Sequence, residues 1–353
     1  NKIMPENNRL NRIVLKAEIA NFLHDKSCQL ALNGGPQAKG SQGAAEEVAV
    51  QLLPLFSGQD KKLINDYIDE KIPYLVFEGL IHTNMDGSPI TIPDKLAFPT
   101  LQELETDIEI LKLASQQQII LALLNETTFA YDKENVGNII RIVANFYGGG
   151  TEKLQNEDPD TSSHSGKAIV PHTEDPYYSA IKVVDGHSPS PSTLVLTARW
   201  NPLYETTKVI SIERALTLLS LEEIIALTTN SFDFRPAKTA GEGKSLGGKQ
   251  VPILELNKDG KLNMNFNPER FSVNPSASAF IKDTYIKFNH ITEKLAFDAV
   301  DLQPSRMIVI NNKISLHSRD IVKDNRRTLV RIFGYRKGTE YNMVSQDPLI
   351  VKS

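Results

Sequence analysis

The sequence predicts an α+β protein whose residues 1–125 are mainly helical and whose later residues form many short β-strands. Three observations support this fold class. Apolar residues recur at helical intervals in the first part, short apolar runs separated by turn residues follow, and 40% of the 353 residues are hydrophobic, enough for a large core. Many short strands are typical of a sandwich, a jelly roll or a barrel. Because no linker separates helices from strands, we expect one domain over residues 1–353, with the strand-rich core at about 126–337.

The helical part contains segments in which apolar residues share one side of a helix. These segments are residues 10–22, 41–56, 60–68 and 101–124. Ser41 is a suitable residue for the start of the second helix. The segment PYLVFEGLI, residues 73–81, has the composition of a strand, and the Asp86-Gly87 pair that follows it is typical of a turn.

After residue 125 the apolar runs are too short for helices and are predicted to be strands. They are residues 136–146, 168–170, 180–184, 194–197, 251–256, 307–310 and 327–335. One helix, residues 211–228, interrupts them. Two polar, glycine-rich insertions, residues 148–165 and 236–248, are predicted to be loops. Long loops in compact domains are often lids or binding elements, so residues 236–248 are a candidate lid, with plain disorder as the alternative.

Composition excludes several classes of protein. Lysine and arginine total 39 and aspartate and glutamate 43, a net charge of −4 that argues against a nucleic-acid partner. The single cysteine, Cys28, excludes a disulfide framework and a cysteine-based zinc cluster. No apolar run approaches the roughly 20 residues of a membrane helix, and no signal peptide opens the chain. We therefore expect a cytoplasmic protein without a membrane partner.

The triplet His172-Thr173-Glu174 follows a strand-like run. Residues i and i+2 of an extended chain point to the same face, so the imidazole of His172 and the carboxylate of Glu174 can bind one ion. Seven histidines in a chain of this composition give roughly one such match by chance, so the triplet alone carries little weight.

A second candidate ligand, His317, lies in the segment SLHSR after an apolar strand and a turn-like Asn311-Asn312 pair. With His172 and Glu174 it would supply two imidazoles and one carboxylate. Such a set leaves coordination positions open and suits non-haem Fe(II). Zinc hydrolases use the same ligand types, so the residues alone do not choose the metal.

Two arginines follow His317 in the segment RRTLVRIFGY. Arg327 and Arg331 are at i and i+4 of a predicted strand and therefore share a face of an otherwise apolar run. An inward-facing guanidinium needs an anionic partner and binds a carboxylate in bidentate fashion. A structural ion pair with an internal acid is the alternative. Beside a metal triad, the pair fits a site for a dicarboxylate cosubstrate.

The segments PHTEDPYY, QPSRMIVINNKISLHSRD and TTKVISIERALTLL together resemble the clavaminate synthase-like branch of the Fe(II)/2-oxoglutarate-dependent oxygenases. The first has His-Thr-Glu where many relatives have His-X-Asp, and the second leads into the distal histidine of that branch. The resemblance covers about residues 135–337. It implies a double-stranded β-helix, a jelly-roll core of the cupin type with flanking helices, and it implies that His172, Glu174 and His317 are the catalytic iron ligands.

The same resemblance implies the cosubstrate site. Arg327, assisted by Thr207, would bind the distal carboxylate of 2-oxoglutarate, and Arg331 would hold the α-carboxylate of the substrate. The stretch between the distal histidine and the arginines is shorter here than in clavaminate synthase. Arg326 or Arg331 is therefore the alternative ligand of 2-oxoglutarate.

The segment NMNFNPERF is the basis for the expected substrate. In the arginine-hydroxylating members an Asp-X-Asp on this segment holds the cationic side chain, and the matching positions here are Asn267 and Glu269. One carboxylate and one amide suit an ammonium better than a guanidinium. The sequence is most similar to the branch that hydroxylates free L-lysine. A solvated turn at Asn267-Pro268 is the alternative.

The sequence thus predicts a dioxygenase that hydroxylates C3 or C4 of free L-lysine, with Fe(II), 2-oxoglutarate and O2. Arginine or asparagine as the substrate, and desaturation as the reaction, are the alternatives within the class. Halogenation is disfavoured because Glu174 fills the position that halogenases leave to chloride. A zinc hydrolase and a metal-free jelly-roll binding module are the alternatives from other classes. The oligomeric state and the stereochemistry are left open.

Overall fold

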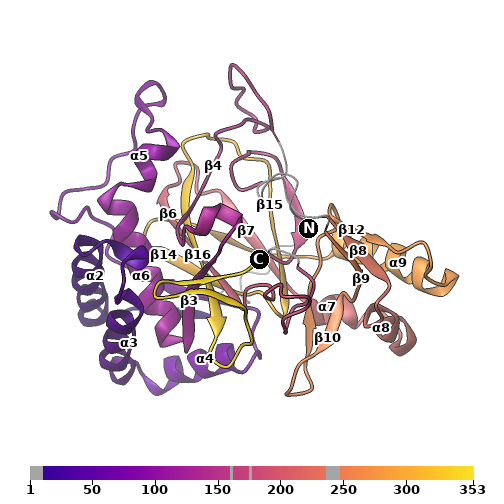
Figure 1. Ribbon diagram of the computed structural model, residues 1–353. Helices are drawn as coiled ribbons and strands as arrows, with labels where there is room; N and C mark the ends of the chain where they lie inside the picture. The colour runs from indigo at the N-terminus through magenta and orange to yellow at the C-terminus, as the bar shows by residue number, and fades with distance from the viewer. Residues whose placement is uncertain (1–10, 160–161, 175–176, 236–246) are drawn as a thin grey trace.

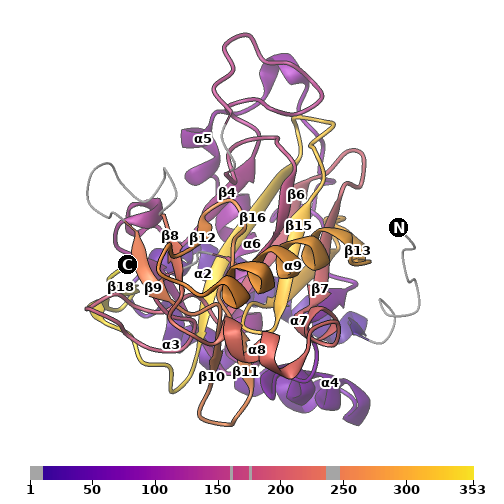
Figure 2. The ribbon, with the colours of Figure 1, turned by 90° about the vertical axis from the view of Figure 1, so that its right-hand side faces the viewer.

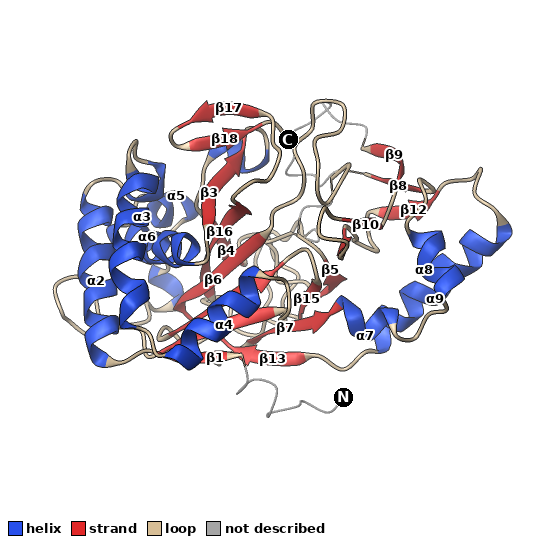
Figure 3. Cartoon of the chain, turned by 90° about the horizontal axis from the view of Figure 1, so that it is seen from below, coloured by secondary structure: helices blue, strands red, loops and turns tan. Residues whose placement is uncertain are grey.

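The computed structural model describes residues 11–159, 162–174, 177–235 and 247–353. Two β-sheets face each other, and helices cover the outer side of each (Figures 1 and 3). The larger sheet has nine strands in the order β1-β2-β14-β6-β16-β3-β18-β17, with β4 paired to β16. Their bounds are β1 Arg12–Val14, β2 Tyr74–Glu78, β3 Glu126–Tyr131, β4 Arg141–Ala144, β6 Thr193–Trp200, β14 Arg306–Asn311, β16 Thr328–Arg336, β17 Met343–Gln346 and β18 Leu349–Val351.

The smaller sheet has four strands in the order β13-β7-β15-β5. Their bounds are β5 Ile169–His172, β7 Thr206–Ser211, β13 Asp298–Asp301 and β15 Ser315–Arg319. Beyond it lie a three-stranded sheet and a hairpin, formed by β8 Phe232–Phe234, β9 Gly248–Val251, β10 Leu254–Leu256, β11 Leu262–Met264 and β12 Phe271–Val273. Two facing sheets of short strands are consistent with the jelly roll that the sequence predicts.

The helices form two groups on opposite sides of the paired sheets. The first group packs on the larger sheet and contains α2 Ala17–Leu32, α3 Ser41–Leu52, α4 Gly58–Ile68, α5 Leu101–Glu105 and α6 Ile108–Leu123. The second lies outside the smaller sheet (Figure 2) and contains α7 Ile212–Leu216, α8 Leu221–Leu227 and α9 Ala279–Lys294. Short 3-10 helices occur at Gly35–Gln37, Leu53–Leu55, Lys95–Ala97 and Glu134–Gly137. No helix in the described ranges is both long and apolar enough to cross a bilayer.

Buried apolar clusters fill the spaces between these layers. One lies between the N-terminal helices and the larger sheet, and α6 is buried on nearly every side within it. Gln117 of α6 donates hydrogen bonds to Thr197 Oγ1 at 3.0 Å and to the Val330 carbonyl at 2.8 Å, which fixes the helix on the sheet. A second cluster joins the two sheets and a third joins the smaller sheet to α7–α9. The paired sheets therefore form a rigid frame.

The register of the strands decides which side chains meet between the sheets. On β15, His317 lies opposite His172 of β5, while Arg319 lies opposite Thr207 of β7. On β16, Arg331 lies opposite Arg141 of β4. Because side chains alternate along a strand, these residues and Arg327 all reach the space between the two sheets.

The N-terminal part differs from the sequence prediction in two places. Residues 10–22 were expected to be one helix, but Arg12–Val14 form β1, which pairs in parallel with β2, and α2 begins only at Ala17. The segment 101–124 is two helices. The side chain of Asp107 accepts a hydrogen bond from the backbone of Glu109 and starts α6 as a new helix.

The later part differs as well. The single helix expected at 211–228 is split because Ser220 forms a capping box with Glu223 and begins α8. Residues 180–184 do not form a strand, and Val184 makes only an isolated bridge with His187. The sequence interpretation missed α9, although Ser278 caps it and the buried Tyr285 and Phe288 lie at helical spacing. The other predicted helices and most predicted strands are present within a few residues.

One buried acid lies where α4 meets the larger sheet. Glu126 of β3 accepts a hydrogen bond from Thr193, whose hydroxyl oxygen is 2.7 Å from that of Tyr67, while Glu126 Oε1 has no hydrogen-bond partner among the described residues. Burial raises the pKa of Glu126 from 4.5 to about 7. The folded protein therefore holds this proton in a pH range where the unfolded chain has released it.

Replacing Glu126 by glutamine should change how stability depends on pH. Wild-type stability should fall as the pH rises from 4.5 to 7, because only the folded state then binds the proton, and the loss should reach about 3 kcal/mol. The variant lacks this loss, so its free energy of unfolding relative to wild type should rise over the same range. Urea unfolding at several pH values measures it. The exposed Glu222→Gln is the control, and parallel pH profiles for Glu126→Gln and wild type would contradict the prediction.

Candidate metal centre and its cavity

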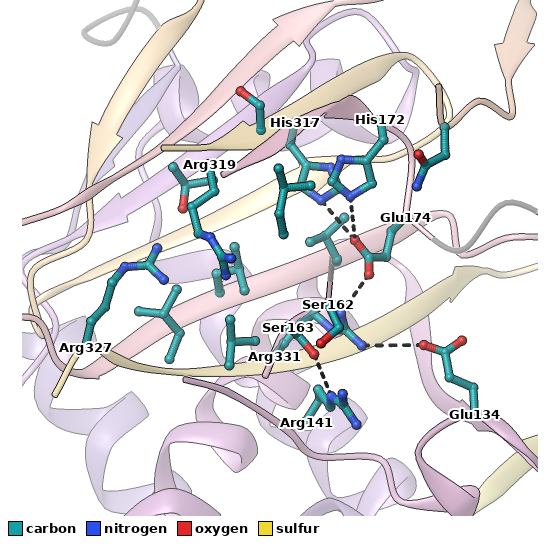
Figure 4. Close-up of a pocket in the computed structure, with 18 of the residues that line it drawn as sticks. Glu134, Arg141, Ser162, Ser163, His172, Glu174, His317, Arg319, Arg327 and Arg331 are labelled. Carbon is teal, nitrogen blue, oxygen red and sulfur yellow. Dashed lines mark hydrogen bonds and ion pairs between the residues drawn. The ribbon is translucent and has the colours of Figure 1, made fainter. Parts of the chain in front are cut away.

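Three side chains converge between the two sheets. His172 ends β5, Glu174 follows two residues later, and His317 is the central residue of β15. Glu174 Oε2 lies 2.9 Å from His317 Nε2 and 3.6 Å from His172 Nε2 (Figure 4). One ligand atom from each of the three residues lies within 4.8 Å of the others. The structure thus brings together the three residues that the sequence predicts as ligands.

Neighbouring groups fix the orientation of His172 and Glu174. The Val170 carbonyl lies 2.8 Å from Nδ1 of His172 and can only accept, so Nδ1 carries the proton and Nε2 presents its lone pair. The Asn312 side chain binds the backbone of Glu174 on both sides: it accepts from the Glu174 N–H at 2.8 Å and donates to its carbonyl at 3.2 Å. Asn312 belongs to the turn that precedes β15, the strand that carries His317. The same turn therefore holds Glu174 close to His317.

Electrostatics place His317 and Glu174 in the protonation states that a metal requires. Burial, reinforced by the neighbouring His172, lowers the pKa of His317 to about 4. Burial opposes the charge of Glu174, but the neighbouring Arg331, together with the two imidazoles beside the carboxylate, overcomes it and holds the pKa of Glu174 well below its usual range. A neutral imidazole and an ionised carboxylate are the ligand forms that bind a divalent cation. Two imidazoles and one carboxylate suit non-haem Fe(II) and also Zn²⁺.

The cavity beside these ligands is lined mainly by cationic and apolar side chains. Among the residues that the structure describes, its arginines are Arg141, Arg270, Arg319, Arg327 and Arg331, and its acids are Glu134 and Glu174. Part of the cavity wall is apolar and is formed by Leu194, Leu196 and Leu329. Figure 4 shows Arg319 and Arg327 on one side of the cavity and Glu174 and Glu134 on the other.

Arg327 is the arginine farthest along the cavity from Glu134 in Figure 4, and it is 2% exposed. Its Nε has no hydrogen-bond partner in the part of the chain that the structure describes. Burial lowers its pKa to about 10, which leaves the guanidinium charged at neutral pH. A buried cation of this kind binds an anion strongly. Thr207, also buried, lines the same cavity and supplies a hydroxyl.

Arg331 and Arg326 have different surroundings. Arg331 Nη1 donates to Glu174 Oε1 at 2.7 Å, and its Nη2 lies 4.0 Å from Glu134 Oε1. Arg331 therefore lies next to the candidate metal ligands. Arg326 pairs with Asp324 at 2.9 Å and does not line the cavity, so its position does not favour a role in binding 2-oxoglutarate.

The two residues of the segment NMNFNPERF are separated by a turn. Asn267 is buried and lines the cavity, but Glu269 is exposed and does not line it. The prediction assumed an extended chain with both side chains on one face. The Asn267 side chain instead accepts from the Glu269 N–H, and its carbonyl accepts from Arg270 and Phe271, which turns Glu269 outward and Arg270 toward the cavity.

Several cavity residues were not found by sequence reasoning. Arg319 had a signal, because it is two residues from His317 on the same strand and must share its face. Arg141 lies within a segment predicted to contain a strand, but nothing in the sequence shows that β4 pairs with β16. Glu134 belongs to a short 3-10 helix that no pattern predicts. The candidate lid, residues 236–248, lies largely outside the described residues, which resume at Gly247.

Solved structures share this fold at low sequence identity. The non-heme iron oxygenase OrfP in complex with Fe and alpha-ketoglutaric acid aligns with a TM-score of 0.67 and 18% identity over 91% of this chain and 92% of that chain. OrfP in complex with Fe, succinate and (3R,4R)-dihydroxy-L-Arg aligns with a TM-score of 0.68 and 18% identity over 91% of this chain and 93% of that chain. Asparagine oxygenase in complex with Fe(II), 2S,3S-3-hydroxyasparagine and succinate aligns with a TM-score of 0.69 and 15% identity over 97% of this chain and 99% of that chain. No protein-family model and no curated protein matches the sequence.

Proposed function

We propose that this protein is an Fe(II)/2-oxoglutarate-dependent dioxygenase that hydroxylates a free amino acid. The observation that carries the proposal is the combination of His172, Glu174 and His317 with the buried Arg327 in one cavity. The fold supports it, because the structures that share it are oxygenases that bind Fe, 2-oxoglutarate or succinate, and amino acids. We also infer that the two facing sheets are the double-stranded β-helix that the sequence predicts.

The three ligands fit iron by their chemistry. Two neutral imidazoles and one carboxylate occupy one side of a cation and leave positions for other molecules. Bound iron would supply the oxidising power with which O2 and 2-oxoglutarate convert C–H to C–OH, yielding succinate and CO2. The polypeptide holds the ligands, binds both organic molecules and excludes water.

We infer that Arg327 binds the distal carboxylate of 2-oxoglutarate. It shares the cavity with the ligands but contacts none of them, so a dicarboxylate can extend from the metal toward it. Arg331 was the alternative, yet its guanidinium already pairs with Glu174 beside the metal. That position suits the carboxylate of the substrate better, and it orients the substrate near the metal.

The choice of lysine as the substrate depended on Glu269, which the structure places outside the cavity. A lysine ammonium would need another acid. Among the described residues that line the cavity, Glu134 is the carboxylate outside the triad, and we infer that it binds an ammonium group of an amino acid. Lysine therefore remains a candidate substrate, with arginine and asparagine as alternatives.

A panel of the twenty amino acids tests the proposal. The protein with Fe(II), ascorbate and 2-oxoglutarate should release succinate and add one oxygen to at least one amino acid, read by mass spectrometry. A zinc hydrolase would bind zinc and leave 2-oxoglutarate unchanged. A metal-free binding module would bind neither metal nor 2-oxoglutarate. Absence of iron binding and of 2-oxoglutarate consumption with every amino acid would contradict the oxygenase assignment.

Replacing Thr207 by valine should weaken the binding of 2-oxoglutarate about tenfold. Valine keeps the shape but removes the hydroxyl, and one hydrogen bond to a charged group contributes roughly 1.5 kcal/mol. The apparent KM for 2-oxoglutarate measures the effect. Thr206→Val is the matched control, because its side chain lies on the opposite face of β7 and does not line the cavity. Equal KM values in all three proteins would contradict this role.

A further inference from the structure

Arg319 extends from β15 into the cavity beside the candidate metal ligands. It follows His317 by two residues, so both side chains point to the same face of the strand, and both line the cavity. Its partner on the neighbouring strand β7 is Thr207. Directly opposed residues of antiparallel strands have Cβ atoms about 5 Å apart. The side chains of Arg319 and Thr207 therefore leave the sheet next to each other and enter the same cavity.

Arg327 reaches this part of the cavity from the larger sheet. It immediately precedes β16 and lines the cavity together with Arg319 and Thr207. Figure 4 shows Arg319 between His317 and Arg327. Burial, followed by the positive charge of Arg327, lowers the pKa of Arg319 to about 9, so the two guanidinium groups act on each other. Donor groups from both sheets are thus gathered at one end of the cavity.

Glu205 is the acid that influences both arginines. Burial lowers the pKa of Arg319 and of Arg327, whereas the carboxylate of Glu205 raises it. The oxygens of Glu205 accept hydrogen bonds from the backbone N–H groups of Lys323 at 2.6 Å and Asp324 at 3.3 Å. Within the described ranges Glu205 forms no ion pair with either arginine. It favours their charged forms from a distance and does not occupy their N–H groups.

Two backbone carbonyls hold the guanidinium of Arg319 in position. Its Nη2 donates to the Ser165 carbonyl at 2.7 Å and to the Lys167 carbonyl, which uses both hydrogens of this nitrogen. Its Nε is buried and has no hydrogen-bond partner among the residues that the structure describes. Arg319 is therefore oriented by the protein and keeps donors on Nε and Nη1 for an anion.

A carboxylate accepts more hydrogen bonds than one arginine donates to it. Its oxygens offer about four lone-pair positions, and a bidentate arginine fills only part of them. Acceptors that stay unpaired in a buried site lower the affinity. Arg327 alone would leave the distal carboxylate of 2-oxoglutarate in this state. Thr207 can fill one further position, and the remaining N–H groups of Arg319 can fill another.

We propose that Arg319 is a second arginine for the distal carboxylate of 2-oxoglutarate, which Arg327, Arg319 and Thr207 bind together. The inference rests on the proposed function and leaves the reaction unchanged. It makes the site selective for a dicarboxylate, because a 2-oxo acid that ends in a methyl group would bring no anion to the two guanidinium groups.

Binding measured without turnover tests the inference. Protein loaded with Fe(II) is titrated under nitrogen with 2-oxoglutarate and, separately, with 2-oxopentanoate, which has the same chain but ends in a methyl group. Arg319→Gln should weaken binding of 2-oxoglutarate roughly 10–100-fold, the usual effect of losing a hydrogen bond to a charged group. Binding of 2-oxopentanoate should be nearly unchanged, so the preference for the dicarboxylate should shrink by the same factor. Arg319→Lys should recover part of the loss because it keeps the positive charge.

Lys208→Gln is the matched control. Lys208 lies next to Thr207 on β7 and opposite Ser318 on β15, pairs with Asp320 at 2.9 Å, and does not line the cavity. The variant removes the same charge from the outer face of the same strand pair. It should bind 2-oxoglutarate as wild type does. Iron content is measured in every variant before titration and should equal that of wild type.

Three results would overturn the inference while leaving the oxygenase assignment intact. They are unchanged binding of 2-oxoglutarate by Arg319→Gln, an equal loss for both 2-oxo acids, and loss of iron. The last two would show that Arg319 only supports the segment whose carbonyls it binds. If Arg319→Gln does not fold, Arg319→Lys decides, because it should lose affinity for 2-oxoglutarate and not for 2-oxopentanoate, and equal losses would overturn the inference. Failure of the wild-type protein to bind iron and 2-oxoglutarate would overturn the proposed function as well.

Discussion

Alanine in place of His317 should abolish 2-oxoglutarate-dependent turnover and release the iron. Three protein ligands hold the ion in the proposed site, and His317 is the one that comes from the other strand. Removing a group that only hydrogen-bonds to a metal ligand lowers metal affinity about 10–100-fold. Removing a ligand itself should lower the affinity for iron by more than that. Iron content after gel filtration and succinate release measure the two effects. The protein should remain folded, because alanine fills part of the same buried site.

His290→Ala is the matched control, since His290 is exposed on α9 and far in sequence from the ligands. It should keep iron and activity. Glu174→Gly should lose hydroxylation even where some metal is retained, because Arg331 then loses its carboxylate partner as well. Full activity of His317→Ala with unchanged iron content would show that the triad is not the metal site.

Replacing Arg327 by alanine should raise the apparent KM for 2-oxoglutarate by roughly two to four orders of magnitude. The carboxylate of the cosubstrate would enter a buried site without its cation, at a cost of roughly 3–5 kcal/mol. The KM for the amino acid should change much less, because Arg331 remains. Initial rates at varied 2-oxoglutarate measure this, and equilibrium titration under nitrogen measures binding separately from turnover.

Arg326→Ala provides a neighbouring control. Its guanidinium pairs with Asp324 outside the cavity, so the variant should bind 2-oxoglutarate as wild type does. The opposite outcome, a large effect at Arg326 and none at Arg327, would mean that the cosubstrate lies elsewhere. A large effect at Arg331 alone would assign 2-oxoglutarate to the arginine beside Glu174.

The candidate metal ligands, which the structure brings together, could be identified from the sequence because their signals are local. His172 and Glu174 are two residues apart on one strand end, and His317 follows an apolar strand and a turn. Arg327 and Arg331 were detectable for a related reason, since the alternation of a strand places them on one face. The general fold class was also accessible, because helical spacing and short apolar runs separate the two halves of the chain.

The other cavity residues depend on information that a single sequence does not contain. Arg141 meets Arg331 only because β4 pairs with β16 in one particular register. Glu269 was placed wrongly because the i, i+2 rule holds for an extended chain, and hydrogen bonds at Asn267 form a turn there. α9 was missed within a region of short strands, although its cap and its spacing are those of an ordinary helix.

The distance along the chain between the ligands has a consequence for how the protein acquires its ion. His317 lies 143 residues after Glu174, so an unfinished or unfolded polypeptide offers only the pair His172 and Glu174. Two ligands on a flexible segment bind a divalent ion weakly and discriminate little between metals. At the proposed site, selection of the metal would therefore follow folding, and an ion that binds only the finished site would shift the equilibrium toward the folded chain. Newly made molecules would then pass through a folded stage that has not yet bound metal.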